Sequence, residues 1–219
     1  YERVLDKLLL FQTRGAGYDF SCTYPRPAFD AQSIQWDLNY FKYMFLKPLG
    51  VVFHEDRLER DFQLFRQWIG DFPSRFFLYR DFQSRNILLK DDQLFFIDFQ
   101  GGRQGPPLYD PASLLYDAKA SLSDNARYHL ARYYFHKLEP LVNLPAKKME
   151  EQFPLFVLLR IFQAMGAYGF RGLVERKILF LQSIPLAIQN LKKTLEKFPE
   201  IKQLPELYQA LQQLLPLEE

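Results

Sequence analysis

The stretch from Phe76 to Gly101 constrains the fold most, because it holds the strand-forming residues of a chain whose remaining pattern is helical. Phe76 to Tyr79 is a short apolar run that leads into the polar loop from Arg80 to Arg85. Ile87 to Leu89 and Leu94 to Ile97 are two further apolar runs, separated by polar residues. This order predicts a strand, a loop and a β-hairpin.

Apolar residues recur at helical spacing on both sides of this stretch. The expected helices cover Tyr1 to Phe11, Asp30 to about Leu46, Glu55 to Ile69, Asp110 to Lys119, Ser123 to about Leu138, Lys147 to about Tyr168, Leu173 to Lys197 and Pro205 to Leu214. The Gly- and Pro-rich segment from Gln100 to Leu108 is expected to be a loop. The predicted fold class is therefore α+β, mostly α, without alternating βαβ units.

Composition excludes several classes of protein. A hydrophobic fraction of 48% with 22 Phe and 13 Tyr indicates a folded chain with an aromatic core. The net charge is +2 and no basic block is present, so nucleic acid is not an expected partner. Charges interrupt the apolar runs, so no membrane partner is expected either. Cys22 is the single cysteine, and no signal-like segment opens the sequence, which together favour a cytoplasmic location.

Three polar residues around the expected hairpin suit phosphoryl transfer. Asp81 lies in the loop, Asn86 opens the hairpin and Asp98 closes it, so the hairpin returns Asn86 and Asp98 to one end. Amide and carboxylate oxygens are hard ligands suited to Mg²⁺, and a carboxylate can accept a proton from a hydroxyl. The alternative is that Asp81 and Asn86 only satisfy the loop backbone, as Asp and Asn often do.

The complete pattern resembles a known group of kinases. Tyr79-Arg80-Asp81 with Asn86, followed by Ile97 to Gly101, is similar to the catalytic loop and metal segment of protein-kinase-like enzymes. The finer resemblance is to the aminoglycoside phosphotransferase/choline kinase-like family. Tyr109 to Leu115 adds similarity to its bacterial branch of sugar kinases, which act on the anomeric hydroxyl of N-acetylmuramate and N-acetylglucosamine.

The resemblance implies a role for each matching residue. Asp81 is implied as the catalytic base, and Asn86 and Asp98 as ligands of Mg²⁺. Asp110 is implied to support the catalytic loop, although it could instead cap the helix that starts near Pro111. Tyr79 departs from the family, which has His at this position, and is expected to play the same structural part.

The resemblance also implies the domain organisation. Residues 1–219 are expected to form a single C-terminal lobe of a protein-kinase-like fold, with the hairpin next to the catalytic loop. Helices of about 30–70 would shape the acceptor pocket, 79–110 would hold the catalytic and metal loops, and 111–219 would be the C-terminal helices. No Gly-rich phosphate loop or strand lysine is present, so the N-lobe is expected from residues upstream of Tyr1.

Four further residues are candidates for phosphate or substrate contacts. Arg85 and Arg103 could neutralise phosphate, although structural pairing with loop carboxylates is the favoured alternative. Asp37 and Tyr40 could bind a sugar from the aromatic helix that starts at Asp30. Ordinary core packing is about equally favoured for these two.

The sequence predicts a small-molecule kinase that moves the γ-phosphate of ATP to a hydroxyl, with Mg²⁺ as cofactor. A sugar or amino sugar is the expected acceptor, and this lobe alone is expected to be inactive. One alternative is a non-catalytic, pseudokinase-like regulatory or binding module. Another keeps the chemistry but changes the acceptor to an aminoglycoside or a choline-like alcohol. Further domains of the same protein are expected partners.

Overall fold

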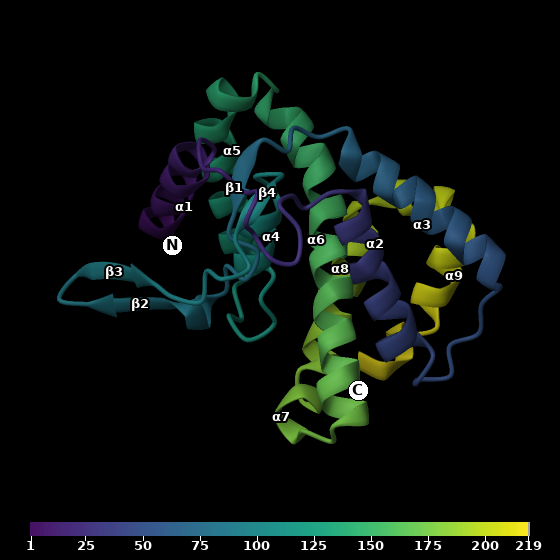
Figure 1. Cartoon of the computed structure of the whole chain (residues 1–219). Coiled ribbons are helices and arrows are strands. Elements are labelled where there is room, and N and C mark those ends of the chain that lie inside the picture. The colour runs from purple at the N-terminus through teal and green to yellow at the C-terminus, as the bar shows by residue number, and fades with distance from the viewer. Residues whose placement is uncertain (219) are drawn as a thin grey trace. The chain divides into compact units, whose positions relative to one another are not determined.

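The structure, a computed structural model, describes residues 1–218 (Figure 1). The chain forms two compact units, and each is built from two separate segments. The first contains Tyr1–Asp30 and Phe72–Phe156, and the second contains Ala31–Asp71 with the residues from Val157 onward. Helices dominate both, and the strands form two small antiparallel sheets. This composition matches the predicted α+β class.

The first unit holds all of the named strands and the helices around them. Its elements are α1 (Glu2–Gly15), β1 (Phe76–Leu78), the 3-10 turn Ser84–Asn86, β2 (Ile87–Lys90), β3 (Gln93–Phe96), β4 (Arg103–Gly105), α4 (Tyr109–Leu115), α5 (Asp124–Val142) and the start of α6 (Ala146–Tyr168).

The predicted hairpin is confirmed, and its turn explains its register. Ile87 pairs with Phe96 and Lys90 with Gln93, which leaves a two-residue turn between β2 and β3 (Figure 1). Asp91 and Asp92 occupy that turn with φ of 48° and 58°. Positive φ at both central residues is typical of the tight turns that match the twist of a hairpin, and Asp tolerates it better than most residues.

The segment expected to be a loop between Gln100 and Leu108 contains a strand, so that prediction was wrong. β4 pairs antiparallel with β1, with Phe76 opposite Gly105 and Leu78 opposite Arg103. β4 has only three residues and lies among Gly and Pro, so it is too short to show the alternation of apolar and polar residues that marks a strand. Their backbone groups are satisfied by β1 on one side and by residues 27–29 on the other, where the amide of Gln104 donates to the carbonyl of Pro27 and its carbonyl accepts from the amide of Phe29.

A close contact ties α1 to β1. Gly15 ends α1, and a Cβ atom added there would lie 2.7 Å from the Cβ of Phe77. The phenyl ring of Phe77 also stacks against Phe20, with ring centroids 6.2 Å apart. On its other side, α1 packs beside α5, where Asp6 binds Lys137 and the Tyr133 hydroxyl (Figure 1).

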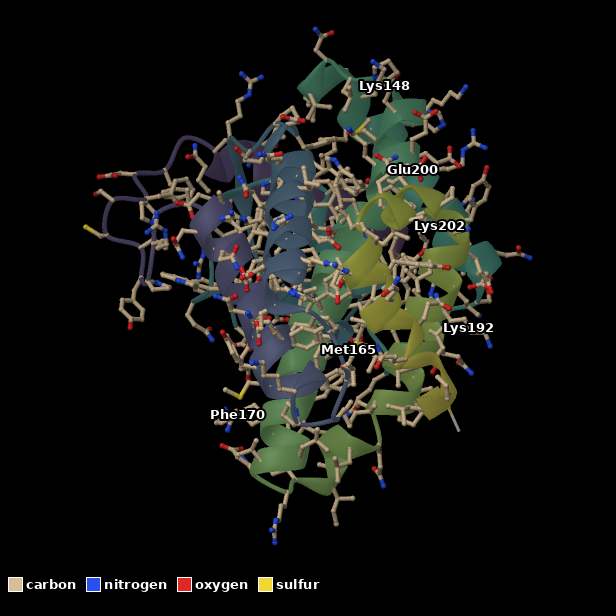
Figure 2. The ribbon with its side chains drawn as sticks, turned by 90° about the vertical axis from the view of Figure 1, so that its right-hand side faces the viewer. Lys148, Met165, Phe170, Lys192, Glu200 and Lys202 are labelled. Carbon is tan, nitrogen blue, oxygen red and sulfur yellow. The ribbon has the colours of Figure 1, made fainter. Side chains whose placement is uncertain are left out.

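The second unit contains helices and helical turns but no named strand among its described residues. Its elements are α2 (Ala31–Phe41), a π turn (Lys42–Leu46), α3 (Glu55–Gly70), the rest of α6, a π turn (Gly169–Val174), α7 (Ile178–Leu181), α8 (Ile184–Lys197), the 3-10 turn Pro199–Gln203, α9 (Pro205–Gln212) and the 3-10 turn Leu215–Glu218. Exposed charges, such as Lys192, Glu200 and Lys202, lie on its surface, whereas Met165 of α6 is fully buried (Figure 2).

Aromatic packing builds the core of the second unit. The ring of Phe41 stacks on that of Phe162 at 4.6 Å between centroids, and Phe65 joins them at 5.7 Å from Phe162. Lys42 is buried next to this core, and its ammonium group is paired with Glu55 and Glu59 of α3. Phe41, Phe65 and Phe162 are all fully buried, so these contacts lie in the core of the unit.

The long helix predicted from Leu173 to Lys197 is broken in the structure. One π turn ends at Val174, α7 covers Ile178–Leu181, and α8 begins at Ile184. Pro185 lies in the first turn of α8, where its missing N–H group costs no hydrogen bond. Proline is poorly tolerated within a helix, so a new helix begins one residue before it, at Ile184.

One stretch, residues 146–174 of α6 and the following π turn, is long and apolar enough by length and composition to cross a membrane. The expectation that charges keep every apolar run short therefore does not hold for this segment. Its most apolar window is 67% buried inside the structure, which is usual for a core helix.

The tight contact at Gly15 gives a test of the α1–β1 packing. We expect Gly15→Ala to lower the free energy of unfolding by about 1–3 kcal/mol, because the new methyl group must displace Phe77. Gly17→Ala is the matched control, since nothing lies within 4 Å of its added Cβ atom. Urea unfolding measures both variants, and equal stabilities for the two would contradict the packing described here.

Candidate active site

The polar loop between β1 and β2 is fixed by its own backbone. The amide of Gln83 donates to the carbonyl of Asp81 at 2.8 Å, and the amide of Asn86 donates to the carbonyl of Gln83 at 2.9 Å. A single 3-10 turn, Ser84–Asn86, then leads into β2. These bonds hold Asp81 and Asn86 on one compact turn.

Asn86 connects the three residues that the sequence predicted to act together. Its buried carboxamide nitrogen donates to the backbone carbonyl of Asp81 at 2.9 Å and to a carboxylate oxygen of Asp98 at 3.3 Å. Both protons of the amide are used in this way, which leaves its oxygen available as an acceptor or a metal ligand. The expected cluster of Asp81, Asn86 and Asp98 is therefore present in the first unit.

The two carboxylates of the cluster are accessible. Asp98 is exposed and Asp81 is partly exposed. Across residues 1–218, the Asp81 carboxylate accepts no hydrogen bond, so it is open to a ligand. No three His, Cys, Asp or Glu side chains gather into a metal-binding group in the described chain. Mg²⁺ needs only one or two carboxylates besides other oxygens, so the oxygens of Asn86 and Asp98 fit it chemically.

Two residues of the site have a strained backbone. Arg80 has φ of 74° and Asp98 has φ of 69°, in the left-handed region that residues other than Gly rarely adopt. Such conformations cost about 1–3 kcal/mol each and persist only where surrounding contacts enforce them. Arg80 directly precedes Asp81, and Asp98 is itself one of the residues expected to do chemistry.

Tyr79 enforces the conformation before Asp98. Its hydroxyl donates to the carbonyl of Ile97 at 2.8 Å, while the amide of Ile97 donates to the carbonyl of Asn86 at 3.0 Å. Burial, with the nearby charges of Asp98 and Asp110, raises the pKa of Tyr79 to about 12. The hydroxyl is therefore a permanent donor, and the role of Tyr79 in place of the family's His remains a prediction.

Asp110 enforces the conformation at Arg80. It is fully buried as the second residue of α4, so it is not the cap of that helix. One carboxylate oxygen accepts from the amide of Tyr79 and the other from the amide of Arg80, both at 2.8 Å. Burial raises the pKa of the Asp110 carboxyl to about 7, although these hydrogen bonds oppose the shift.

The arginines near the site differ in exposure. Arg85 is exposed on the 3-10 turn, and Arg103 is buried in β4 with its Nε donating to the carbonyl of Gly101 at 3.0 Å. The guanidinium of Arg80 lies 5.1 Å from the ring centre of Phe29. Contacts of Arg85 or Arg103 with phosphate or substrate remain predictions.

The candidate acceptor residues belong to the second unit. Asp37 is buried in α2, and Tyr40 of the same helix is half-buried with its ring 6.4 Å from that of Phe170. Burial, followed by the charges of Arg171 and Glu175, shifts the pKa of Tyr40 upward. Their role as substrate contacts remains a prediction.

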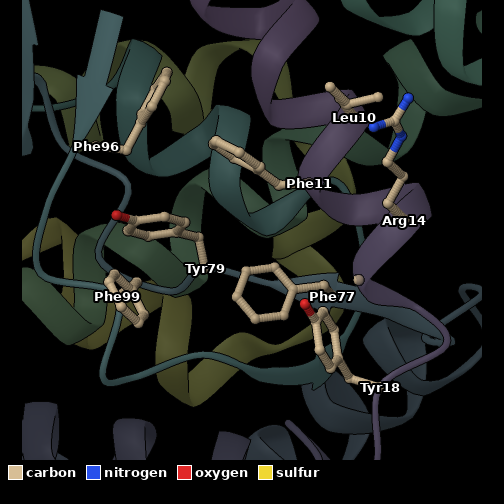
Figure 3. A pocket seen from close by; sticks show the side chains of 9 residues that line it. Leu10, Phe11, Arg14, Tyr18, Phe77, Tyr79, Phe96 and Phe99 are labelled. Atoms are coloured by element: carbon tan, nitrogen blue, oxygen red, sulfur yellow. The ribbon is translucent and has the colours of Figure 1, made fainter.

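An apolar cavity of about 450 Å³ borders the site on the side of Tyr79 (Figure 3). Its lining is mainly aromatic and includes Phe11, Phe77, Phe96 and Phe99 around Tyr79. Phosphate and Mg²⁺ require polar surroundings, so this cavity does not suit them. The polar cluster at Asn86 is the better candidate for the chemistry.

The sequence prediction missed two residues that reach the site from other helices. Gln12 of α1 and Tyr134 of α5 are both buried beside Asp110. One signal was available, because Gln12 lies on the same buried stripe of α1 as Leu5 and Leu8. A polar residue on an apolar helix face needs a buried partner.

Removing the Tyr79 hydroxyl tests its support of the segment that leads to Asp98. We expect Tyr79→Phe to lower the free energy of unfolding by about 0.5–1.5 kcal/mol, because one partly buried hydrogen bond to Ile97 is lost. Tyr18→Phe serves as the control, since Tyr18 is 74% exposed. Denaturant unfolding compares the two, and a Tyr79→Phe variant as stable as the control would show that the bond contributes nothing.

Comparisons with known proteins agree with these features. The sequence profile of the phosphotransferase enzyme family matches residues 21–144, more than half of the chain. The N-acetylmuramate/N-acetylglucosamine kinase of Pseudomonas aeruginosa is 26% identical over 220 residues. The match covers 97% of this chain and 63% of that kinase, so the chain spans less than two thirds of its relative's length. The resemblance found in the sequence is confirmed, and the chain belongs to the phosphotransferase enzyme family.

Proposed function

We propose that this protein transfers the γ-phosphate of ATP to a hydroxyl group of a small molecule. The observation that carries the proposal is the bridge made by Asn86, whose amide nitrogen binds both the Asp81 carbonyl and the Asp98 carboxylate. Phosphoryl transfer needs positioned groups and charge neutralisation more than covalent chemistry. The cluster offers both within one loop and one hairpin.

Asn86 and Asp98 are the residues that we assign to the metal. Their side-chain oxygens would hold Mg²⁺, which neutralises phosphate charge when it is bound. The Tyr79 hydroxyl and the strained backbone at Asp98 keep these oxygens in place, as the contacts at Ile97 indicate. This ligand set explains why a buried Asn with a free amide oxygen lies beside an exposed Asp.

Asp81 is the residue that we assign to the acceptor hydroxyl. Its carboxylate is partly exposed and accepts no hydrogen bond within residues 1–218. A carboxylate in this position can orient the hydroxyl and accept its proton as the bond to phosphorus forms. Asp110 acts behind it by holding the amides of Tyr79 and Arg80.

A sugar or amino sugar is the acceptor class that we favour. The support is the relative whose name describes a kinase of N-acetylmuramate and N-acetylglucosamine. In this proposal Asp37 and Tyr40 contribute to the acceptor pocket, since a carboxylate and an aromatic ring are groups that bind sugars.

The chain as a whole corresponds, in this proposal, to the C-terminal lobe of a protein-kinase-like fold. This lobe would bind the metal and the acceptor, and a further lobe of the same protein would grip the nucleotide. The relative is longer than the matched region, which leaves room for such a lobe.

Two substitutions in the full-length protein test the assignment. We expect Asp98→Ala to abolish transfer from Mg²⁺-ATP to N-acetylmuramate and N-acetylglucosamine, because a metal ligand is lost. Asp81→Asn should lower kcat by about 10²–10⁴-fold, the usual contribution of a positioned base. A coupled assay of ADP release with each sugar measures both effects.

Asp91→Asn is the matched control, because it removes an exposed carboxylate from the tip of the same hairpin. It should retain the activity of the unmodified protein. Full turnover by Asp98→Ala would overturn the metal assignment. Absence of transfer by the unmodified full-length protein with every sugar tested would instead favour a non-catalytic module.

A further inference from the structure

Gln12 makes a buried polar connection between α1 and the support of the catalytic loop. Its side chain is fully buried, and its amide nitrogen donates to the Pro107 carbonyl at 2.9 Å. The second proton of this amide points to a carboxylate oxygen of Asp110 at 3.3 Å. Gln12 thus donates to the same oxygen that accepts from the backbone amide of Tyr79.

Tyr134 fixes the orientation of the side-chain amide of Gln12. Its buried hydroxyl donates to the amide oxygen of Gln12 and lies 3.0 Å from the carbonyl of Pro107. The hydroxyl therefore occupies the oxygen of Gln12, so the nitrogen must face Asp110. Burial raises the pKa of Tyr134 well above its ordinary value, so this donor stays protonated.

We infer that Gln12 is a positioning residue of the phosphoryl-transfer site, oriented by Tyr134, and that it keeps Asp110 in the ionised form that holds the catalytic loop. This inference rests on the proposed function, because the loop at Asp81 matters for turnover only if the protein is a phosphotransferase. Neither residue touches the reacting groups, and both act through Asp110.

The chemistry of Asp110 explains why a neutral donor is needed there. A carboxylate can accept from the amides of Tyr79 and Arg80 with both oxygens, whereas a protonated carboxyl must use one oxygen as a donor. Burial disfavours the ionised form, and the hydrogen bond from Gln12 favours it. Without Gln12, Asp110 should bind a proton at higher pH and release one of the two loop amides.

The titratable groups facing Asp110 do not supply this support. Asp81 adds a negative charge that raises the pKa of Asp110 further. Tyr79 and Tyr134 remain neutral, since burial raises the pKa of each. Arg80 contributes its backbone amide, and its guanidinium lies over the ring of Phe29. Gln12 is the side-chain donor to Asp110 among residues 1–218.

The first test follows the carboxyl group itself. Carbon-13 NMR of the Asp110 carboxyl in the full-length protein gives its titration midpoint. We expect Gln12→Leu to raise the midpoint by about 0.5–1 pH unit, which corresponds to the loss of one hydrogen bond. Tyr134→Phe should shift it in the same direction by less, and it serves as the second variant if Gln12→Leu does not fold. An unchanged midpoint in the folded variants would overturn the inference.

The second test follows turnover against pH with Mg²⁺-ATP and the sugar that the protein phosphorylates. The acid limb of kcat should move to higher pH by the same amount in each variant, with little change in KM. Tyr133→Phe is the matched control, because its hydroxyl joins α5 to Asp6 of α1 without reaching Asp110. Tyr133→Phe should leave the acid limb of the kcat profile at the pH of the unmodified protein.

The outcomes separate this inference from the proposed function. A pH-independent loss of kcat, with the limb unmoved, would assign Gln12 a merely structural role and overturn the inference while phosphoryl transfer stands. If the unmodified protein transfers no phosphate, the proposed function fails and the positioning role falls with it. The NMR midpoint would then report only the hydrogen bond to Asp110.

Discussion

The buried carboxylate of Asp110 is the interaction on which the candidate site depends. It accepts from the backbone amides of Tyr79 and Arg80, and so it determines how the chain leaves β1. The left-handed conformation of Arg80 is stable only because this bond and its neighbours enforce it. Asp81 directly follows Arg80, and the 3-10 turn that ends at Asn86 comes shortly after it. One side chain that binds backbone amides thus positions both Asp81, the base that we propose, and Asn86, the metal ligand that we propose.

The ionised form of Asp110 holds the loop, but it lowers the stability of the folded protein. The pKa of Asp110 is raised by burial from its ordinary value near 4 to about 7 in the folded protein. Its contribution to folding is therefore fully present below about pH 4 and is lost as the pH rises toward 7. The ionised form, which dominates above that range, is the one that can hold both loop amides. The molecule gives up part of its stability near neutral pH to keep the loop in one shape.

Local features of the sequence were sufficient to predict the cluster. The strand, the polar loop and the hairpin lie within one short segment, and the Asp91-Asp92 turn fixes the register that returns Asp98 to Asn86. β4 was missed because it has no pattern of its own and forms by pairing with β1 and with residues 27–29, which are distant in the sequence. The position of Gln12 on the buried stripe of α1 indicates that it needs a buried partner, but that partner lies 98 residues away and no local pattern identifies it.

The central claim is that Asn86 and Asp98 hold the metal while Asp81 stays free for the acceptor. A crystal structure of the full-length protein with Mg²⁺ and a non-hydrolysable ATP analogue tests it most directly. We expect a metal ion about 2.0–2.1 Å from the amide oxygen of Asn86 and a carboxylate oxygen of Asp98, with Asp81 unbound to it. A metal ion that binds the nucleotide without contacting both of these residues would contradict the account.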